Sequence, residues 1–518
     1  MLVIRSLNVA RRLNRCVLLT CSVLVLLSFR LSAQQVPAGA VLEARLSVAT
    51  GSGISHAGDQ IEATTIAPVS VRGQILVPQG SKLFGTVGSV SRLALGLKHT
   101  TATIHYSFHT LRLMEGETIL IKAEVIDVEN AKERVDTTGT VHGILPIASL
   151  SSALNFYAVP LLCVAPTVGA SVWGVKSLIA PSANPEIYFP AGTEVILRLT
   201  APVKIPYANT EPLRITSFSP YEMTEIYRLL KSSAQRARLG TRSSDVVNLL
   251  FLASRKQMDH AFHAAGWSQA ERKSPVSLYR LYHALTRRIG YSRAPMNTLT
   301  LNGEPADFVY QKNLDTVQKR HHVRLWKEPQ RRDLWFGTAA EDIAFRFTLA
   351  HWTHSTDPKI DNERAKVVDD LAFTGCLAAA GMLTRNSPDL SQGSERKDVI
   401  VTDGDIAVLR LKDCGEPNIM PGVDASSPFP RRGSLLRALI SLRNDLVRSN
   451  ILFTTYNTVK YVSERRALGA AQPSLDVPQR ELDWLRSTHA STETGALKSQ
   501  TDRTPSSRHE KSQTAHCS

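Results

Sequence analysis

The sequence predicts an α+β protein in which an all-β domain, a sandwich or a barrel, precedes an α+β domain with a mixed or antiparallel sheet. Three observations predict this arrangement. Residues 36–205 contain short runs in which apolar and polar residues alternate, which is the period of a half-buried strand. From about residue 216, helices with clear start and stop signals alternate with strands. A chain of 518 residues is also too long for one hydrophobic core.

The first 33 residues have the pattern of a secretory signal peptide. Arginines precede the apolar run Cys16–Phe29, and small residues allow cleavage after Ala33. The run is shorter than the roughly 20 residues of a spanning helix; an uncleaved membrane anchor is the alternative. Export would permit disulfides, and Cys376–Cys414 is the pair that we consider.

Three segments of the first domain share a turn pattern. Each has an apolar residue, a proline, a small or polar residue and a glycine before a strand-like run: VPAGAVLEARL (36–46), VPQGSKLFGTV (77–87) and FPAGTEVILRL (189–199). We expect the proline to fix φ at the second turn position and the glycine to allow a tight turn. These repeats and the strands between them define the all-β domain at 36–205.

An apolar insertion at 137–180 separates the second and third repeats. No Asp, Glu, Lys or Arg occurs from Thr137 to Val175, so contact with a membrane is one interpretation. The alternative is a buried crossover rich in glycine, serine and proline. Prolines at 146, 160 and 166 interrupt any long helix, so we do not expect a single spanning helix.

The repeats resemble the TrbI-type β-barrel of conjugation and type IV secretion outer-membrane core complexes. The resemblance rests on VPAGAVLEARL, the following Gly58 and Asp59, ILVPQGSKLFGTV and the later PAGT strand. It covers 36–205 and implies a β-barrel, with the insertion in the position of the helical antenna of that family.

The second domain, at 216–422, begins with well-marked helices. Ser219, Ser254 and Ser274 are expected N-caps, and prolines 220 and 275 occupy first helical positions. The segment 238–243 reads as a linker. We expect a turn at Asn302 and Gly303 and a final β-hairpin at 398–411.

The stretch KRHHVRLWKEPQRRDLWFG (319–337) places two adjacent histidines in a strand. Because neighbouring side chains of a strand point to opposite faces, His321 is expected to share the apolar face as a hydrogen-bonded core residue. His322 then lies on the other face, which offers cationic side chains to an anionic group. The predicted binding residues are Arg320, His322, Arg324, Trp326 and Arg364.

A metal site is a second interpretation of the same region. The predicted ligands are His322, His354 and Asp361, which could hold a divalent metal such as zinc, with Glu363 as general base. The structural interpretation is equally concrete, because Asp357 can cap a helix beginning at Pro358 and Asp361 can pair with Arg364. Glu363 then lies in the first turns, where negative charge is favoured. No HExxH motif fixes the ligand geometry.

Five motifs of the second domain resemble the LssY C-terminal domain family. They are GWSQA, LYHALTRRIGYSRAPMNTLTLNGEPADFVYQK, RHHVRLW, DLWFGTAAED and THSTDPKIDNERAKVVDDL. Members occur in bacterial envelope proteins, and LssY itself was named as a type I secretion component, so the resemblance implies an envelope location but no reaction. Its signature positions are Arg320, His321, His322, Arg324, Trp326, His354, Asp361, Glu363 and Arg364.

The C-terminal fifth divides into two parts. Residues 430–466 are expected to form a helical or strand extension, with an amphipathic helix from Ser434 to Arg448 that packs on the second domain or lies on an anionic membrane. Residues 467–518 are expected to be a largely disordered tail with one short helix at 478–487.

A net charge of +15 predicts affinity for polyanions. Export would make these partners anionic lipids or envelope polymers rather than nucleic acid. No GxSxG, GxxxxGK[ST] or GxGxxG motif is present. The first hypothesis is therefore an exported periplasmic or membrane-associated protein, a binding or assembly module with a link to secretion. The alternative is a metal-dependent hydrolase that uses His322, His354, Asp361 and Glu363.

Overall fold

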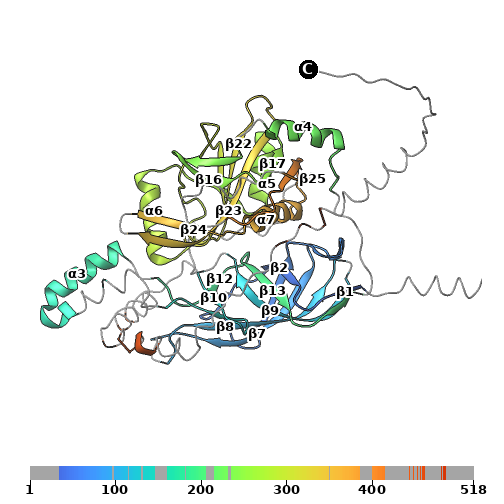
Figure 1. Ribbon diagram of the computed structural model, residues 1–518. Helices are drawn as coiled ribbons and strands as arrows, with labels where there is room; N and C mark the ends of the chain where they lie inside the picture. The colour runs from blue at the N-terminus through green and yellow to red at the C-terminus, as the bar shows by residue number, and fades with distance from the viewer. Residues whose placement is uncertain are drawn as a thin grey trace, which may run out of the picture.

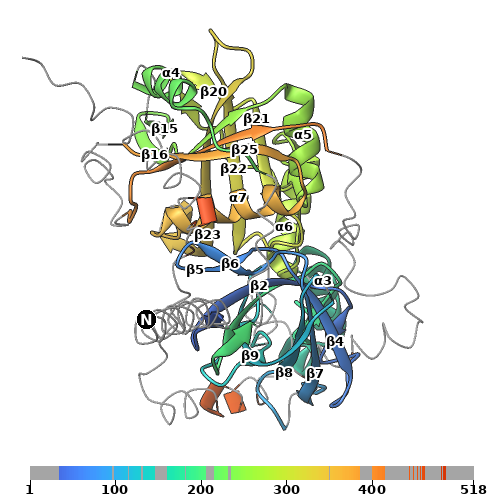
Figure 2. The same cartoon turned by 90° about the vertical axis from the view of Figure 1, so that its right-hand side faces the viewer.

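The computed structural model describes residues 34–414 with short gaps, and isolated positions between 443 and 485. The gaps are 96–97, 115, 130–131, 146–153, 155–159, 181–182, 206–214, 232–234, 349–350 and 386–399. The predicted signal peptide, most of the predicted extension at 430–466 and most of the predicted tail lie outside the described residues. Two domains follow one another along the chain and lie side by side in Figures 1 and 2.

The first domain is a closed β-barrel of six antiparallel strands. Their order is β8-β7-β4-β2-β13-β9, and β8 also pairs with β9, which closes the ring. The prediction of an all-β domain is confirmed, with the barrel as the form that it takes. The barrel strands are β2 (Val41–Leu46), β4 (Gln60–Thr65), β7 (Lys82–Ser91), β8 (Thr103–Arg112), β9 (Thr118–Val128) and β13 (Glu194–Leu199).

Short strand pairs and one helix surround the barrel. The described part of the apolar insertion ends in α3 (Pro166–Ile179), which lies at the outer edge of the molecule in Figure 1. The short strands are β1 (Gln34–Val36) with β14 (Val203–Ile205), β3 (Thr50–Gly51) with β12 (Tyr188–Phe189), β5 (Val69–Val71) with β6 (Gln74–Val77), and β10 (Arg134–Val135) with β11 (Thr140–His142).

The three repeats form tight turns, but the proline stands one position earlier than expected. In each repeat the proline carbonyl accepts a hydrogen bond from the amide three residues later, at 3.2–3.4 Å. Proline is therefore the first residue of the turn. The shared glycine is the third, and its φ lies between +87° and +93° at Gly39, Gly80 and Gly192. A type II turn requires positive φ at this position, which explains why each repeat has glycine there.

The second domain is built on one mixed sheet, as predicted. Its order is β18-β21-β22-β23-β17-β26-β25, and β24 pairs with β23. The β17–β26 pair is parallel, and the other pairs of this sheet are antiparallel. The strands are β17 (Leu249–Leu252), β18 (Trp267–Gln269), β21 (Phe308–Lys312), β22 (Arg320–Lys327), β23 (Leu334–Thr348), β24 (His351–Thr356), β25 (Leu377–Leu383) and β26 (Ile406–Leu411).

Helices and a small second sheet cover the two faces of this mixed sheet. α5 (Arg255–Ala264) and α7 (Ile360–Phe373) pack on one face with Phe251 and Val323. α4 (Pro220–Lys231) and the small sheet pack on the other face with Trp326. α6 (Pro275–Arg287) packs beside them on Ala294 and Val317. The small sheet consists of β15 (Arg236–Leu239), β16 (Arg242–Val246), β19 (Thr300–Leu301) and β20 (Glu304–Pro305).

Local sequence signals located several elements correctly. Ser254 and Ser274 form the N-caps of α5 and α6, each in a capping box. Ser219 precedes α4, and its hydroxyl and amide both bind Glu222. Asn302 and Gly303 have positive φ at the predicted hairpin turn.

Three other local predictions were wrong. The segment 238–243 is no linker, because Gly240, with φ +61°, turns the chain between β15 and β16. Residues 398–411 contain β26, which pairs with β25 and β17 instead of folding back on itself. The helix predicted from Pro358 begins at Ile360, and Asp357 instead accepts a hydrogen bond from the Lys359 amide at 3.0 Å, before the helix.

Candidate functional site

The strand β22 distributes its polar residues to two faces of the sheet. Val323 belongs to the core beneath α5 and α7, whereas Trp326 belongs to the core on the opposite face. His321 is fully buried and hydrogen-bonded to Glu363 on α7. His322 contacts carboxylates of another set. The predicted separation of the two histidines is confirmed.

The His322 face carries a closed set of ion pairs, which we call the arginine strip: Arg320, His322, Arg324, Asp245 and Asp342. Arg320 binds Asp342 at 2.8 Å and Arg324 binds Asp245. His322 lies 3.7 Å from Asp245 and 3.9 Å from Asp342. Burial alone would raise the pKa of Asp245, but Arg324 and His322 outweigh it and lower that pKa. Two carboxylates thus match two guanidinium groups.

The predicted binding residues face these partners rather than solvent. Arg320, His322, Arg324 and Trp326 are each at most 6% exposed, and the Trp326 indole donates to the Glu304 carbonyl at 3.1 Å. The fifth, Arg364, lies on α7 and is treated below. Contact with an anionic polymer would require the strip to open, so binding by these residues stays a prediction.

The predicted metal ligands His322 and Asp361 have separate partners. Asp361 accepts hydrogen bonds from the Thr402 hydroxyl at 2.8 Å and the Asp403 amide at 2.7 Å. It also lies 3.1 Å from Arg364, which confirms the predicted pair, and Arg364 binds Asp403 as well. His354 belongs to β24, but its side chain lies outside the described residues. This ligand set stays a prediction without geometric support.

The opposite face of the sheet meets the barrel through α7. This helix lies between the sheet and the barrel in Figure 1, and every residue from Ile360 to Ala372 is buried. Lys366 lies 2.7 Å from Glu129 and 2.6 Å from Glu194, both on or beside barrel strands. Lys312 on β21 lies 2.5 Å from Asp370 and 3.1 Å from Glu194. Buried ion pairs therefore connect the two domains.

A short C-terminal segment also packs at this boundary. Arg480 binds Glu43 and Glu129 of the barrel, the latter at 2.5 Å. The Trp484 indole donates to Asp369 on α7 at 3.2 Å, and Leu482 and Leu485 join the core of the second domain. Leu482, Trp484 and Leu485 are buried and Arg480 is partly buried, within a segment predicted to be largely disordered. The polar composition of the segment did not predict these contacts, although the pattern RELDWL contains three large apolar residues.

The charged groups at this boundary form one network, which we call the interdomain charge cluster. Its cations are Arg45, Lys312, Lys319, Lys366 and Arg480, joined by His321. Its carboxylates are Glu43, Asp127, Glu129, Glu194, Asp315, Glu341, Glu363, Asp369 and Asp370. Nine carboxylates thus face five permanent cations and one histidine among the described residues. Of these carboxylates, only Glu363 was predicted from the sequence as a site residue.

Burial and the neighbouring charges together shift the pKa values in the cluster. Burial would lower the pKa of His321, but Glu363, Glu341 and Asp315 outweigh it and raise the value to about 10. Burial raises the pKa of Glu341 to about 7 despite His321 and Lys319 nearby. Burial also raises the pKa of Asp315. Asp315 and Glu341 therefore keep their protons more readily than free carboxyl groups do, and His321 is a cation at neutral pH.

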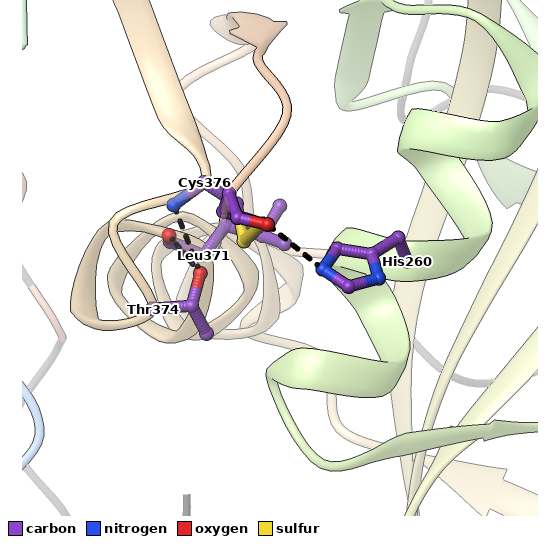
Figure 3. The surroundings of a disulfide bond; sticks show 5 residues. His260, Leu371, Thr374 and Cys376 are labelled. Carbon is purple, nitrogen blue, oxygen red and sulfur yellow. Dashed lines mark hydrogen bonds between the residues drawn. A yellow bond between two sulfur atoms is a disulfide. The ribbon is translucent and has the colours of Figure 1, made fainter. Parts of the chain in front are cut away.

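A disulfide bond lies just after the C-terminal end of α7. Cys376 is bonded to Cys414 with the Cα atoms 4.8 Å apart, which confirms the pair considered from the sequence. In Figure 3 the Thr374 hydroxyl donates to the Leu371 carbonyl and accepts from the Cys376 amide. The imidazole of His260 on α5 lies 3.1 Å from the Cys414 carbonyl. The bond joins the start of β25 to the chain just after β26.

One face of α3 is apolar and open to solvent. Val168, Val172, Val175 and Ile179 follow one another at helical spacing and are 41–55% exposed. At about 1.5 Å per residue, its 14 residues fall short of a hydrocarbon core about 30 Å thick. Within the described part of the chain, no helix has the length and apolarity needed to span a bilayer.

Comparison with known proteins identifies the second domain. Residues 229–406 match the LssY C-terminus family. This match confirms the resemblance predicted from the five motifs, and we call this part of the chain the LssY-type domain. No curated protein matches the chain.

Among solved structures, the chain is similar to ComB10 of the Com type IV secretion system of Helicobacter pylori. The two are 13% identical, and the match covers 34% of this chain and 94% of that chain with a TM-score of 0.20. A score this low establishes no common fold.

Proposed function

We propose that the chain is an exported cell-envelope protein, a binding and assembly module linked to secretion. The observation that carries this proposal is the family match of the LssY-type domain over 229–406. The signal-peptide pattern at 1–33 supports export. The Cys376–Cys414 disulfide supports it independently, because disulfides persist in oxidising compartments.

The contact between the domains supports a module rather than a hinged enzyme. Lys366, Lys312 and Arg480 join carboxylates of both domains in a buried network. Separating the domains would expose these ions and break several pairs at once, which opposes independent domain motion. The barrel and the LssY-type domain then present one continuous surface.

The partner in this proposal is an anionic lipid surface. The apolar face of α3 would enter the headgroup region, and the net charge of +15 would draw the chain to anionic lipid. Because α3 is too short to cross a bilayer, it would lie along the surface instead.

Cell fractionation with protease accessibility tests the location. We expect a processed chain in the envelope fraction that becomes protease-sensitive only after the envelope is permeabilised. Recovery of the intact, unprocessed chain in the soluble cytosolic pool would contradict export.

Sedimentation with vesicles of anionic lipid tests the membrane contact. Replacing Val168 and Val175 with glutamine should weaken binding at least about tenfold, because two exposed apolar side chains lose their contact with lipid. Val276→Gln is the matched control, since Val276 is 57% exposed on α6. Equal binding by both variants would remove α3 from the proposal.

A further inference from the structure

Three potential metal ligands converge on the LssY-type side of the interdomain charge cluster. His321 of β22, Glu341 of β23 and Glu363 of α7 each offer one ligand atom, and these atoms lie within 4.8 Å of one another. Among the described residues, no other group of three or more His, Cys, Asp or Glu side chains brings its ligand atoms this close together. His321 and Glu341 stand opposite each other in the β22–β23 register, so the sheet itself fixes two of the ligands.

Unsatisfied atoms in the same place point to a missing partner. The Nε2 atom of His321 and the Oε1 atom of Glu363 are buried without a hydrogen-bond partner. Their side chains are 0% and 2% exposed. Buried polar atoms normally have partners, and each unpaired atom costs about 1–3 kcal/mol. Two such atoms on a hydrogen-bonded pair of side chains indicate that a partner is missing there.

The geometry around His321 is close to that of a metal-bound imidazole. Nδ1 lies 2.7 Å from Oε2 of Glu363. Two tetrahedral ligands at about 2.0–2.1 Å from zinc lie about 3.3 Å apart, so a shift of about 0.6 Å admits the ion between these atoms. Nε2 then lies 3.5 Å from Oε2 of Glu129. A ligand histidine characteristically directs its second ring nitrogen at such a carboxylate.

The chemistry of the three ligands also favours a cation. None of them bears a permanent positive charge, and two of them are carboxylates. A divalent ion would neutralise both ligand carboxylates. One imidazole with two carboxylates is a donor set that suits zinc or manganese.

We propose that His321, Glu341 and Glu363 bind one divalent transition-metal ion, with zinc as the best fit, and that Glu129 of the barrel orients the His321 ring. The site is buried between the domains, so its role is structural: the ion stabilises the junction of the barrel and the LssY-type domain. This inference goes beyond the proposed function and does not depend on export.

Calorimetric titration of the chelator-treated full chain with Zn²⁺ tests the site. We expect one ion per chain, release of protons on binding, and a higher melting temperature with Zn²⁺. Glu341→Gln should weaken uptake more than about 100-fold, since loss of a ligand costs more than loss of an outer partner. Glu341 is half-buried, so this isosteric change should leave the fold intact, as circular dichroism can check.

Glu304→Gln is the matched control, because Glu304 is exposed on β20, and it should bind Zn²⁺ as the wild type does. Absence of stoichiometric Zn²⁺ uptake by the wild type would overturn the proposal, and so would unchanged uptake by Glu341→Gln. Loss of uptake in Asp361→Asn with full uptake in Glu341→Gln would place the ion at the other predicted ligand set and would equally overturn it. None of these results bears on the cellular location.

Discussion

His321 and His322 are neighbours in sequence, yet they lie in opposite electrostatic surroundings. His322 belongs to the arginine strip, where Asp245 and Asp342 match Arg320 and Arg324 within one domain. His321 belongs to the interdomain charge cluster, where carboxylates outnumber cations and several come from the barrel. Strand alternation sent the two imidazoles to different faces, and only one face meets the other domain.

The difference shows what each set of charges does. In the arginine strip, the charged side chains pair with one another within one domain. These pairs position the side chains and leave little charge for a ligand. The cluster joins two domains and brings His321, Glu341 and Glu363 together, so it can both hold the domains together and accept a cation. Adjacent residues of one signature motif thus serve separate purposes.

The largest expected effect distinguishes the cluster from ordinary surface pairs. Lys366→Met removes the cation between Glu129 and Glu194 and leaves both carboxylates buried without it. Loss of one partner of a buried ion pair costs about 3–5 kcal/mol. We expect the free energy of unfolding, measured with urea, to fall by that amount.

Lys82→Met provides the comparison for that measurement. Lys82 pairs with Glu62 at 3.0 Å, but both side chains are more than one third exposed. Exposed pairs contribute about 0–1 kcal/mol. A loss for Lys366→Met as small as that of Lys82→Met would show that the cluster does not hold the domains together.

The next largest loss of stability is expected on removal of the disulfide bond beside α7. Cys376 and Cys414 are separated by 38 residues, and closing a loop of that length stabilises a fold by about 2–4 kcal/mol. The Cys376→Ser, Cys414→Ser double variant should lose about that much on urea denaturation. A reductant should destabilise the wild type but not the variant. Equal sensitivity of both proteins would contradict a role for this bond.

Local signals made much of the LssY-type domain predictable. Serine caps located α5 and α6, Asn302 and Gly303 located a turn, and strand alternation separated the two histidines. Each of these signals acts within a few residues of chain. The closure of the barrel by the β8–β9 pair could not be predicted in the same way, because no local pattern specifies it.

The interdomain charge cluster could not be predicted either, because local patterns do not specify contacts between distant parts of the chain. Polar residues of a helix normally face water, so Asp361 and Arg364 suggested an ion pair. Asp361 and Glu363 also suggested a ligand and a general base of a metal site. Lys366 on the same helix instead meets Glu129 and Glu194, more than 170 residues earlier in the chain. Arg480 was hidden in a segment with the composition of a disordered tail. The sequence of α7 alone does not show that the helix is buried on all sides, because the barrel that covers its second face is distant in the chain.

The smallest expected effect concerns acid stability and tests whether the arginine strip is matched. The pKa of Asp245 is lowered in the folded protein, because Arg324 and His322 outweigh its burial. The ionised carboxylate therefore adds stability above the ordinary aspartate pKa of about 3.9, and this contribution is lost as the pH falls below that value. Asp245→Asn removes it at every pH. The stability difference between wild type and variant should thus shrink by about 1–2 kcal/mol between about pH 6 and about pH 3 in urea titrations.

Glu304→Gln, with its exposed side chain, should show no such convergence. A constant difference between wild type and Asp245→Asn would mean that the carboxylate is not held in its charged form, and the strip would then resemble the other face, where burial raises the pKa of Asp315 and Glu341.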